Sequence, residues 1–320
     1  MAVIGTWNVE NLFRPGSPFG PPDDATYRAK LAALATTINA ASPDVLGVQE
    51  VGEPDALADL VDLLDGNWHV ALSKHFEAAH PIRTGVLSRT PVEVVQDVDN
   101  FPDKLAAVQV QDGSARTHQV GRGVLAVSVE PTPGKRVVVA VCHLKSKLLS
   151  YPASGGGTRF FPRNEGERAR YAGFALFRRA AEAVTVRALA DQLLEGHGQT
   201  RPVLVLGDFN DEPAAATTLI PLGPPGSELG TPGAQVPDKG DAWRLWNLAP
   251  LLPEGERFTR IYHGRRELID HIMVSRALLD GVTEVSTRGA AQLPSIGDDP
   301  RVGHGIRGSD HSPVLARITL

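Results

Sequence analysis

The sequence predicts an α/β fold, because strand-length apolar runs alternate with segments that have the apolar spacing of a helix. A second observation is that several apolar runs end on an acid, an amide or a histidine, which is how α/β sheets present polar groups at strand ends. A third is that these polar strand ends are distributed from Asn8 to His311. A site assembled from both ends of the chain implies that residues 1–320 form one domain.

The expected strands are short and rich in valine, isoleucine and leucine, as buried strands are. They lie at Val3–Trp7, Val45–Glu50, Trp68–Leu72, Thr84–Ser88, Val92–Val98, Val124–Val129, Val137–Val141, Val203–Leu206, Leu268–Val274 and Val314–Ile318.

Helices are expected at Thr26–Ala40, Pro54–Leu64 and Gly166–Leu194, where apolar residues recur three or four positions apart. In the longest of them the predicted buried stripe consists of Phe174, Phe177, Ala181, Val184 and Ala188.

The remaining segments are rich in glycine, proline or polar residues. We expect loops or a hairpin at Phe101–Arg122, a mobile loop beside the site at Tyr151–Asn164, a loop-rich insertion at Pro221–Lys239 and a loop at Gly297–Ser309, and Trp243–Leu252 is ambiguous. Gly303–Gly308 fits the pattern G-x-G-x-x-G, but no strand precedes it and no helix follows it, so a dinucleotide site is not predicted.

Composition describes a globular protein, with 42% hydrophobic and 22% charged residues. The net charge of −5 provides no general attraction for nucleic acid, so such binding would need local basic patches. Cys142 is the only cysteine, which excludes an internal disulfide and a cysteine-based zinc cluster. No apolar run approaches a membrane span, and the N-terminus lacks signal-peptide features. We expect a cytoplasmic protein, and secretion stays open if a leader has been removed.

The stretch Leu204–Asp211 carries the most informative polar residues. Alternate residues of a strand face the same side, so Asp208 and Asn210 point one way while Phe209 packs the other way. A carboxylate can take a proton from water, and an amide can hold a phosphoryl oxygen. On this stretch alone, a strand followed by a polar turn is an equally good interpretation.

Oxygen ligands dominate the other strand ends. Glu50, Asp208 and Asp310 supply carboxylates, and Asn8 and Asn210 supply amides. Such ligands suit Mg²⁺, Mn²⁺ or Ca²⁺ rather than zinc.

Two histidines also lie at strand ends, where they can act as acid or base or donate to phosphate oxygens. They are His143 and His311, and Asp270 could orient one of the imidazoles. Taken singly, each of these residues is more often a turn or cap residue.

Six motifs occur along the chain in one order: Thr6–Phe13, Gln49–Glu50, His143–Ser146, Gly207–Asn210, Ile269–Ile272 and Ser309–Val314. Together they resemble the endonuclease/exonuclease/phosphatase superfamily, which has the DNase I-like fold, and the first motif resembles bacterial nuclease-like members. The resemblance implies a four-layer α/β sandwich, in which two packed mixed β-sheets are flanked by helices. It replaces the simple doubly wound sheet that strand–helix alternation alone suggests.

The resemblance also implies roles for individual residues. Glu50 matches the metal-binding glutamate, Asn8 the asparagine that supports metal and phosphate, and Glu10 an acid near a second metal position. Asp208 matches the residue that prepares the attacking water, and Asn210 the one that holds the phosphate. The resemblance thus implies a metal group of Glu50, Asn8, Asp310 and Glu10 and a catalytic group of Asp208, Asn210, His143, His311 and Asp270. Relatives specialised for abasic sites usually lack a histidine at position 143, which argues against that specialisation.

The resulting hypothesis is a phosphodiester hydrolase that depends on Mg²⁺ or Mn²⁺, with Ca²⁺ as a third option, and cleaves DNA or RNA by in-line attack of water. Basic residues after His143 are candidate substrate contacts, namely Lys145, Arg159, Arg163 and Arg168. A solvated helix face with interspersed glutamates explains these arginines equally well. The alternatives are a sphingomyelinase-like or small-molecule phosphoesterase and a catalytically inactive binding module, and the oligomeric state is open.

Overall fold

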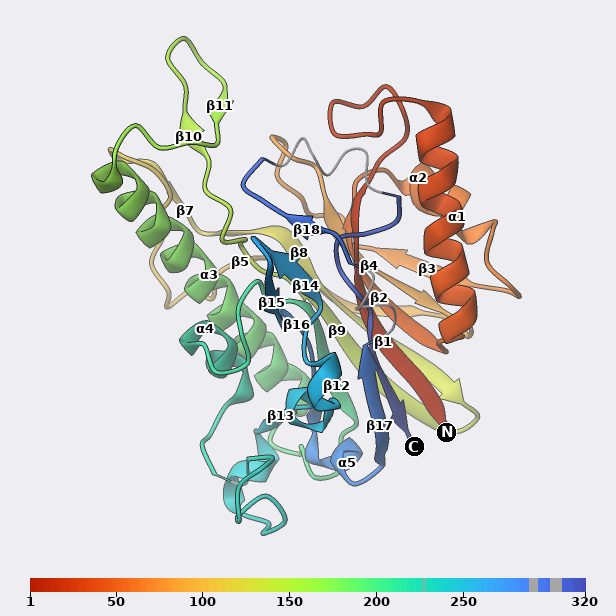
Figure 1. Ribbon diagram of the computed structural model, residues 1–320. Coiled ribbons are helices and arrows are strands. Elements are labelled where there is room, and N and C mark those ends of the chain that lie inside the picture. The colour runs from red at the N-terminus through yellow and green to blue at the C-terminus, as the bar shows by residue number, and fades with distance from the viewer. Residues whose placement is uncertain (227, 288–292, 300–306) are drawn as a thin grey trace.

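Two six-stranded mixed sheets pack face to face in the computed structural model, which describes residues 1–226, 228–287, 293–299 and 307–320 (Figure 1). The first sheet has the order β17-β19-β1-β2-β4-β3 and the second the order β13-β16-β12-β9-β8-β5. The first comprises β1 (Ala2–Leu12), β2 (Val45–Val51), β3 (His69–Leu72), β4 (Arg83–Ser88), β17 (Val282–Thr287) and β19 (Val314–Ile318). The second comprises β5 (Glu93–Asn100), β8 (Gln119–Thr132), β9 (Lys135–His143), β12 (Val203–Asp208), β13 (Leu245–Asn247) and β16 (Asp270–Ser275).

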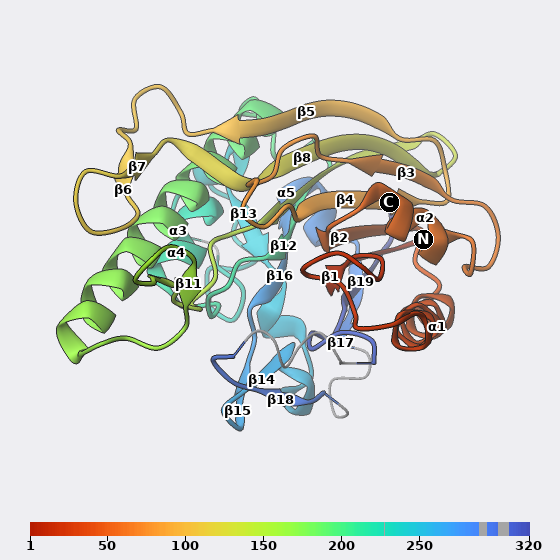
Figure 2. The same cartoon turned by 90° about the horizontal axis from the view of Figure 1, so that it is seen from above.

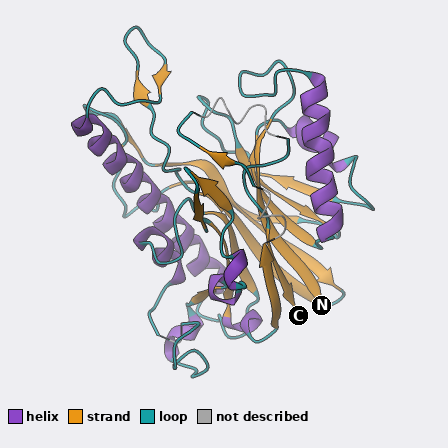
Figure 3. Ribbon diagram, in the orientation of Figure 1, coloured by secondary structure: helices purple, strands orange, loops and turns teal. Residues whose placement is uncertain are grey.

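Helices cover the outer faces of both sheets, as the views in Figures 2 and 3 show. On the first sheet, α1 (Asp24–Ala41) and α2 (Pro54–Val61) bury leucines against β1 and β2. On the second sheet, α3 (Glu165–Leu194) packs against β8, β9 and β12. Asn164 caps α3 by accepting a hydrogen bond from the backbone N–H of Glu167. This arrangement confirms the four-layer α/β sandwich.

The central core lies between the sheets and is made of aliphatic side chains from both, among them Ile4, Val86, Val139 and Leu206. At Gly47 of β2 the two sheets approach closely. A Cβ there would overlap Cδ1 of Leu206, so a larger residue would force the sheets apart.

One end of the sandwich collects the polar strand ends. β1 runs parallel to β2, and β9 runs parallel to β12, so four carboxyl ends lie at this end. β16 and β19 are antiparallel to their neighbours β12 and β1, so they begin where those strands finish. The two sheets meet here through a hydrogen bond from Asn8 Nδ2 to Asp208 Oδ2 of 3.1 Å.

The remaining elements are short. They are α4 (Ala216–Leu219), α5 (Arg276–Leu279), the hairpin β6 (Val108–Gln109) with β7 (Arg116–Thr117), the pair β10 (Tyr151–Pro152) with β11 (Thr158–Arg159), and the strands β14 (Arg260–Tyr262), β15 (Arg265–Glu267) and β18 (Ser295–Ile296). Single 3₁₀ turns lie at Ile220–Leu222, Lys239–Ala242, Ala249–Leu251 and Glu254–Glu256. No helix among the described residues is long and apolar enough to span a membrane.

All ten predicted strands are present, β19 with the predicted bounds and the others with shifted ends, and the segment 101–122, predicted as loops or a hairpin, contains the hairpin β6–β7. The edge strand β17 was not predicted, because its two valines, Val282 and Val285, lie three positions apart and so lack the period of two that marks a strand. The predicted loop at 297–309 and the glycine pattern at 303–308 fall largely outside the described residues.

The predicted buried stripe of α3 is partly wrong. Phe177 is 53% exposed, while Arg178 and Glu182 on the adjacent positions are buried. Arg178 Nε donates to Glu182 Oε1 over 3.0 Å, so the buried face of the helix includes a pair of opposite charges. Hydrophobic periodicity cannot detect a buried face that is made of paired charges.

Candidate active site

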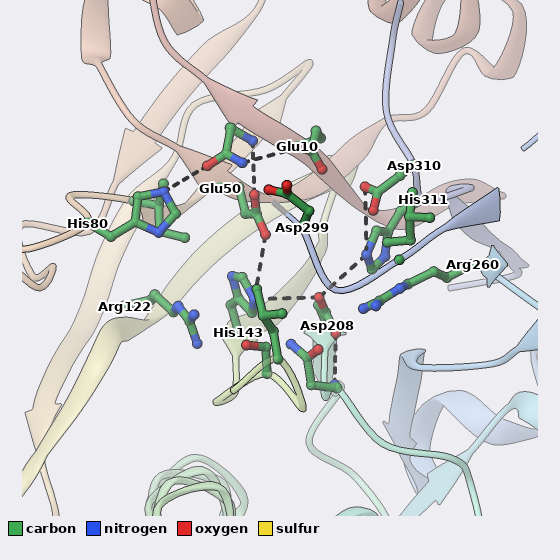
Figure 4. A pocket seen from close by; sticks show the side chains of 17 residues that line it. Glu10, Glu50, His80, Arg122, His143, Asp208, Arg260, Asp299, Asp310 and His311 are labelled. Carbon is green, nitrogen blue, oxygen red and sulfur yellow. Dashed lines mark hydrogen bonds and ion pairs between the residues drawn. The ribbon is translucent and has the colours of Figure 1, made fainter. Parts of the chain in front are cut away.

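A cavity of about 160 Å³ opens at the end of the sandwich where the polar strand ends meet (Figure 4). Seven of the predicted site residues line it, and they come from β1, β2, β9, β12 and the segment before β19: Glu10, Glu50, His143, Asp208, Asn210, Asp310 and His311. The predicted residues Asn8 and Asp270 lie behind this lining and bond to it.

Asp208 is placed by a close approach between β12 and β9. Gly207 has φ of 146°, and a Cβ there would overlap the carbonyl oxygen of Cys142, so only glycine fits. The carboxylate of Asp208 is buried and accepts hydrogen bonds from Asn8 Nδ2 and from the backbone N–H of Asn210. Burial and the neighbouring Asp270 raise the pKa of Asp208 to about 6.

His311 is held by Asp270. Its Nδ1 lies 2.8 Å from Asp270 Oδ2, and its Nε2 lies 3.9 Å from Asp208 Oδ2. Burial alone would lower the pKa of His311, but Asp270, Asp310 and Asp208 together raise it to about 10. The imidazole is therefore a cation that Asp270 orients toward the cavity.

His143 lies on the other side of Asp208 and, unlike His311, is uncharged. Its Nε2 is 3.5 Å from Asp208 Oδ2 and 3.9 Å from Glu50 Oε1. Burial and the nearby Arg122 lower its pKa well below the ordinary value, so this imidazole is neutral. Asp208 is thus flanked by one neutral and one protonated histidine.

Three further carboxyl groups converge at the β1 side of the cavity, those of Glu10, Glu50 and Asp310. Asn8 Nδ2 donates to Glu50 Oε1 over 3.0 Å and orients that carboxylate. Burial and the adjacent Asp310 raise the pKa of Glu10 to about 8. Lys30 of α1 is also buried here, and its Nζ donates to the backbone oxygen of Glu10.

The cluster formed by the three carboxyl groups of Glu10, Glu50 and Asp310 fits a divalent cation. The oxygens are of the hard type that Mg²⁺ and Mn²⁺ prefer, and their mutual repulsion would be relieved by a bound ion. Asp310 Oδ1 is buried and has no hydrogen-bond partner among the described residues, which leaves a lone pair for a ligand bond.

A second group of ligand atoms within 4.8 Å of one another comprises Asp208, Asp270 and His311. Asp270 Oδ1 has no hydrogen-bond partner among the described residues, but the group fits a cation less well, because His311 is protonated and its Nδ1 donates to Asp270 Oδ2, so the imidazole has no lone pair for a metal.

The backbone at the site is held in unusual conformations. Among the described non-glycine residues with left-handed φ, four belong here: Glu10 (54°), Asn11 (41°), Glu50 (63°) and Asn210 (53°). Each such residue costs on the order of 1–3 kcal/mol and persists only when surrounding contacts fix it. Asn11 N–H donates to Glu50 Oε2 over 2.9 Å and is one of those contacts.

The sequence matches the model of the Endonuclease/Exonuclease/phosphatase family over residues 5–311. The chain belongs to this family. Its members are nucleases and phosphatases, enzymes that hydrolyse phosphoester bonds. A comparison with curated protein sequences finds no match.

Solved structures of the same fold agree with this membership. The mannosyl-6-phosphatase of Bacteroides thetaiotaomicron is 13% identical with a TM-score of 0.56, and both chains are covered completely. The 3′ phosphatase NExo from Neisseria, bound to a product DNA hairpin, is 18% identical with a TM-score of 0.53 and complete coverage of both chains. The catalytic domain of human Nocturnin is 16% identical with a TM-score of 0.52, over 99% of this chain and 94% of the other.

Among the cavity residues that were not predicted as site residues, four carry charged or titratable side chains: His80, Arg122, Arg260 and Asp299. His80 Nε2 lies 2.8 Å from Asn11 Oδ1, and Arg260 forms an isolated β-bridge with His311. The clustering of Arg260 with Arg265 and Arg266 was visible in the sequence as a basic run. Arg122 lies inside β8 and His80 in the segment between β3 and β4, both far from the family motifs, so neither had a comparable signal in the sequence.

The predicted substrate-binding residues lie outside this cavity. Arg159 Nη2 pairs with Glu167 over 2.5 Å, and Arg168 pairs with Glu165 over 2.5 Å. Arg163 contacts Ser154 Oγ at 3.5 Å. Lys145 lies beside the cavity, where its Nζ donates to the backbone oxygens of Ser146 and Leu148.

Proposed function

We propose that the protein is a divalent-metal-dependent phosphodiester hydrolase that acts on nucleic acid by in-line attack of water. The observation that carries the proposal is the position of Asp208 between His143 and His311, next to a separate group of carboxylates. A base, an acid and a cation site are then arranged around one cavity.

The carboxylates of Glu10, Glu50 and Asp310 would hold the metal ion, with Asn8 orienting Glu50. When bound, a divalent ion neutralises charge on the phosphate. Mg²⁺ or Mn²⁺ fits the oxygen ligands, and Ca²⁺ would also be accommodated.

Asp208 would accept the proton of the attacking water. Its pKa of about 6 places it near neutrality, where a base is both ionised and effective. The hydrogen bonds from Asn8 and Asn210 fix the direction of its oxygens.

His311 would donate a hydrogen bond to the phosphate as charge accumulates there. Neutral His143, on the other side of Asp208, would contact the phosphate or the leaving oxygen, and Asn210 would hold a phosphate oxygen. The Nδ2 of Asn210 already donates one bond to the Leu144 carbonyl over 3.0 Å, which leaves its second amide hydrogen available.

Nucleic acid is the proposed substrate class. The neighbour NExo is bound to DNA, while the Bacteroides neighbour is named for a sugar phosphate. Lys145, the 151–164 segment with Arg159 and Arg163, and Arg168 at the start of α3 would contact the backbone beyond the cleaved bond. Two of these arginines would have to exchange their glutamate partners for phosphates.

A substrate panel tests the proposal. Plasmid DNA, single-stranded DNA, RNA, sphingomyelin and mannose 6-phosphate are each incubated with Mg²⁺, Mn²⁺, Ca²⁺, Zn²⁺ or EDTA, with Asp208→Asn protein as the matched control. We expect cleavage of a nucleic acid with Mg²⁺ or Mn²⁺ and none in EDTA. Cleavage of only the lipid or the sugar phosphate would move the protein to the corresponding alternative, and full activity after exhaustive metal removal would refute the metal site.

A further inference from the structure

A second and larger cavity, of about 610 Å³, adjoins the catalytic one. The two share five lining residues, Asn11, His80, Arg122, Ser146 and Leu148, so these side chains lie at the boundary between adjacent cavities. We call the larger cavity the side chamber. Its volume is within the roughly 300–1,000 Å³ of small-molecule sites.

Aromatic rings form much of the chamber wall. Tyr171 and Phe174 of α3 are buried and meet edge to face, with ring centroids 5.4 Å apart. Phe160, from the segment after β11, and Phe19, which packs on His80 at 4.4 Å, also line it. Rings held by such contacts present flat apolar surfaces without further loss of side-chain freedom.

The chamber also has a positive side next to the catalytic cavity. Arg178 is paired with Glu77 and with Glu182. Among the described residues, neither Arg122 nor Lys145 has a carboxylate within ion-pair distance. Arg122 Nη1 instead donates to the Leu144 carbonyl, and Lys145 Nζ donates to Ser146 and Leu148.

We propose that the side chamber receives the sugar and base of one unpaired nucleotide whose phosphate lies in the catalytic cavity. This inference rests on the proposed function and names the form of nucleic acid that the site takes. Arg122 belongs to both cavities and would contact the phosphate at their junction. The base would stack on the aromatic wall, with Lys145 at its edge.

A base suits this chamber better than a hydrocarbon chain does. Covering Lys145, Arg178 and Glu77 with hydrocarbon would remove polar groups from water without replacing their hydrogen bonds, which is costly. A base has both a stacking face for the rings and polar edges for the charged groups. A base within a duplex cannot enter a chamber without leaving its stack, so unpaired or terminal nucleotides are favoured.

Binding titrations test the chamber separately from hydrolysis. The probes are adenosine 5′-monophosphate, ribose 5-phosphate and octyl phosphate, titrated by calorimetry with Mn²⁺ present into Asp208→Asn protein. One stacked base contributes about 1–3 kcal/mol, which is a factor of about 5–160 in affinity, so we expect the nucleotide to bind at least about fivefold more tightly than ribose 5-phosphate.

Ala175→Phe is the blocking variant, because Ala175 lines the chamber and is absent from the catalytic cavity. It should remove the contribution of the base, so that adenosine 5′-monophosphate and ribose 5-phosphate bind this variant with equal affinity. Leu176→Phe is the matched control on the same helix, since Leu176 is 45% exposed and outside the chamber lining, and it should change neither affinity. Ala79→Trp, at the exposed rim, replaces the blocking variant if Ala175→Phe fails to fold.

The outcomes separate the two proposals. Equal affinities for nucleotide and ribose 5-phosphate in the unblocked protein, or nucleotide binding that survives both blocking variants, would overturn the chamber proposal. Octyl phosphate binding more tightly than the nucleotide, with loss on blocking, would assign the chamber to a lipid tail instead. Failure of the hydrolysis panel, with base-dependent binding intact, would leave the chamber and refute only the hydrolytic function.

Discussion

Asp208 is the residue in which the chemistry of the site converges. It receives hydrogen bonds from both sheets' polar strand ends and lies within 4 Å of two imidazoles. Its rotamer is fixed by these contacts, so its carboxylate is positioned before any substrate arrives. Replacing one carboxylate oxygen of Asp208 by an amide nitrogen should therefore impair catalysis without unfolding the protein.

Asp208→Asn should lower kcat by more than about 10²-fold, because an amide cannot accept the proton of water. Steady-state kinetics on the best substrate of the panel measure the decrease. Thermal melts serve as the control and should show a folded protein. A near-native rate in this variant would show that another group is the base.

Lys145 should make the stability of the protein depend on alkaline pH. Burial, followed by Arg122 and Arg178, lowers its pKa from 10.5 to about 7. Between those pH values the unfolded chain binds a proton that the folded chain lacks, so this lysine makes the free energy of unfolding rise with pH.

Lys145→Met lacks this pH dependence. The free energy of unfolding of the variant minus that of the parent should therefore decrease as the pH rises from 7 to 10. Urea unfolding at several pH values measures the difference, and Lys147→Met, whose amine pairs with Asp211 at the surface, is the control. A pH-independent difference would mean that the amine of Lys145 keeps an ordinary pKa.

At the scale of elements, α3 does more than cover the second sheet. Glu182, fully buried, accepts bonds from the backbone N–H groups of Gly121 and Lys145 and from Arg178. The helix thereby fixes the chain directly before Arg122 and directly after Leu144, at the wall between the two cavities.

Glu182→Ala should reduce the free energy of unfolding by about 3–5 kcal/mol, because it leaves two backbone N–H groups and Arg178 Nε without their buried acceptor, and Arg178 keeps only its partner Glu77. Glu165→Ala on the exposed first turn of the same helix should stay within about 0.5 kcal/mol. Chemical denaturation of the two variants side by side decides the matter, and equal effects would contradict a structural role for Glu182.

The triple change Arg159→Ala, Arg163→Ala and Arg168→Ala tests the proposed interaction of the 151–164 segment and the start of α3 with the nucleic-acid backbone. For every phosphate that an arginine no longer neutralises, the salt slope of log K should fall by roughly 0.7–0.9. Because Arg159 and Arg168 are already paired with glutamates, we expect a decrease nearer to that for one phosphate than to that for three. DNA binding across a salt series measures it, and an unchanged slope would exclude the segment from the interface.

The parts of the site that could be predicted are those encoded by neighbouring residues in the sequence. The strand ends carrying Asp208, Glu50 and His143 were predictable, because an apolar run followed by a polar residue fixes both the strand and the side chain's place at its end. Arg122, His80 and the charged inner face of α3 were not predictable. Their roles depend on partners such as Leu144, Asn11 and Glu182, which only the tertiary fold brings near them.

At the scale of the whole molecule, the site lies across the junction of the two sheets. Glu10 and Glu50 belong to the first sheet and Asp208 to the second, and Asp310 comes from the end of the chain. From this arrangement we infer that the chain is one domain. A cation bound here should therefore stabilise the entire fold and not one part of it.

Mn²⁺ at about one hundred times its dissociation constant should raise the free energy of unfolding by about 2.7 kcal/mol over the value in EDTA. Thermal melts at several Mn²⁺ concentrations measure the shift, and Glu50→Gln should abolish most of it. The same melting temperature with and without metal would refute the cation site.

The pairing of β1 with β19 joins the two ends of the sequence inside one sheet. Trp7 Nε1 donates to the His311 backbone oxygen over 2.8 Å, so the first strand is completed only by the last one. At roughly 5–20 residues per second, about 15–60 s separate the synthesis of these two strands on a ribosome. During that interval the growing chain carries Asn8 and Glu10 without Asp310 and His311. An unfinished chain would thus lack part of the proposed catalytic group until synthesis is nearly complete.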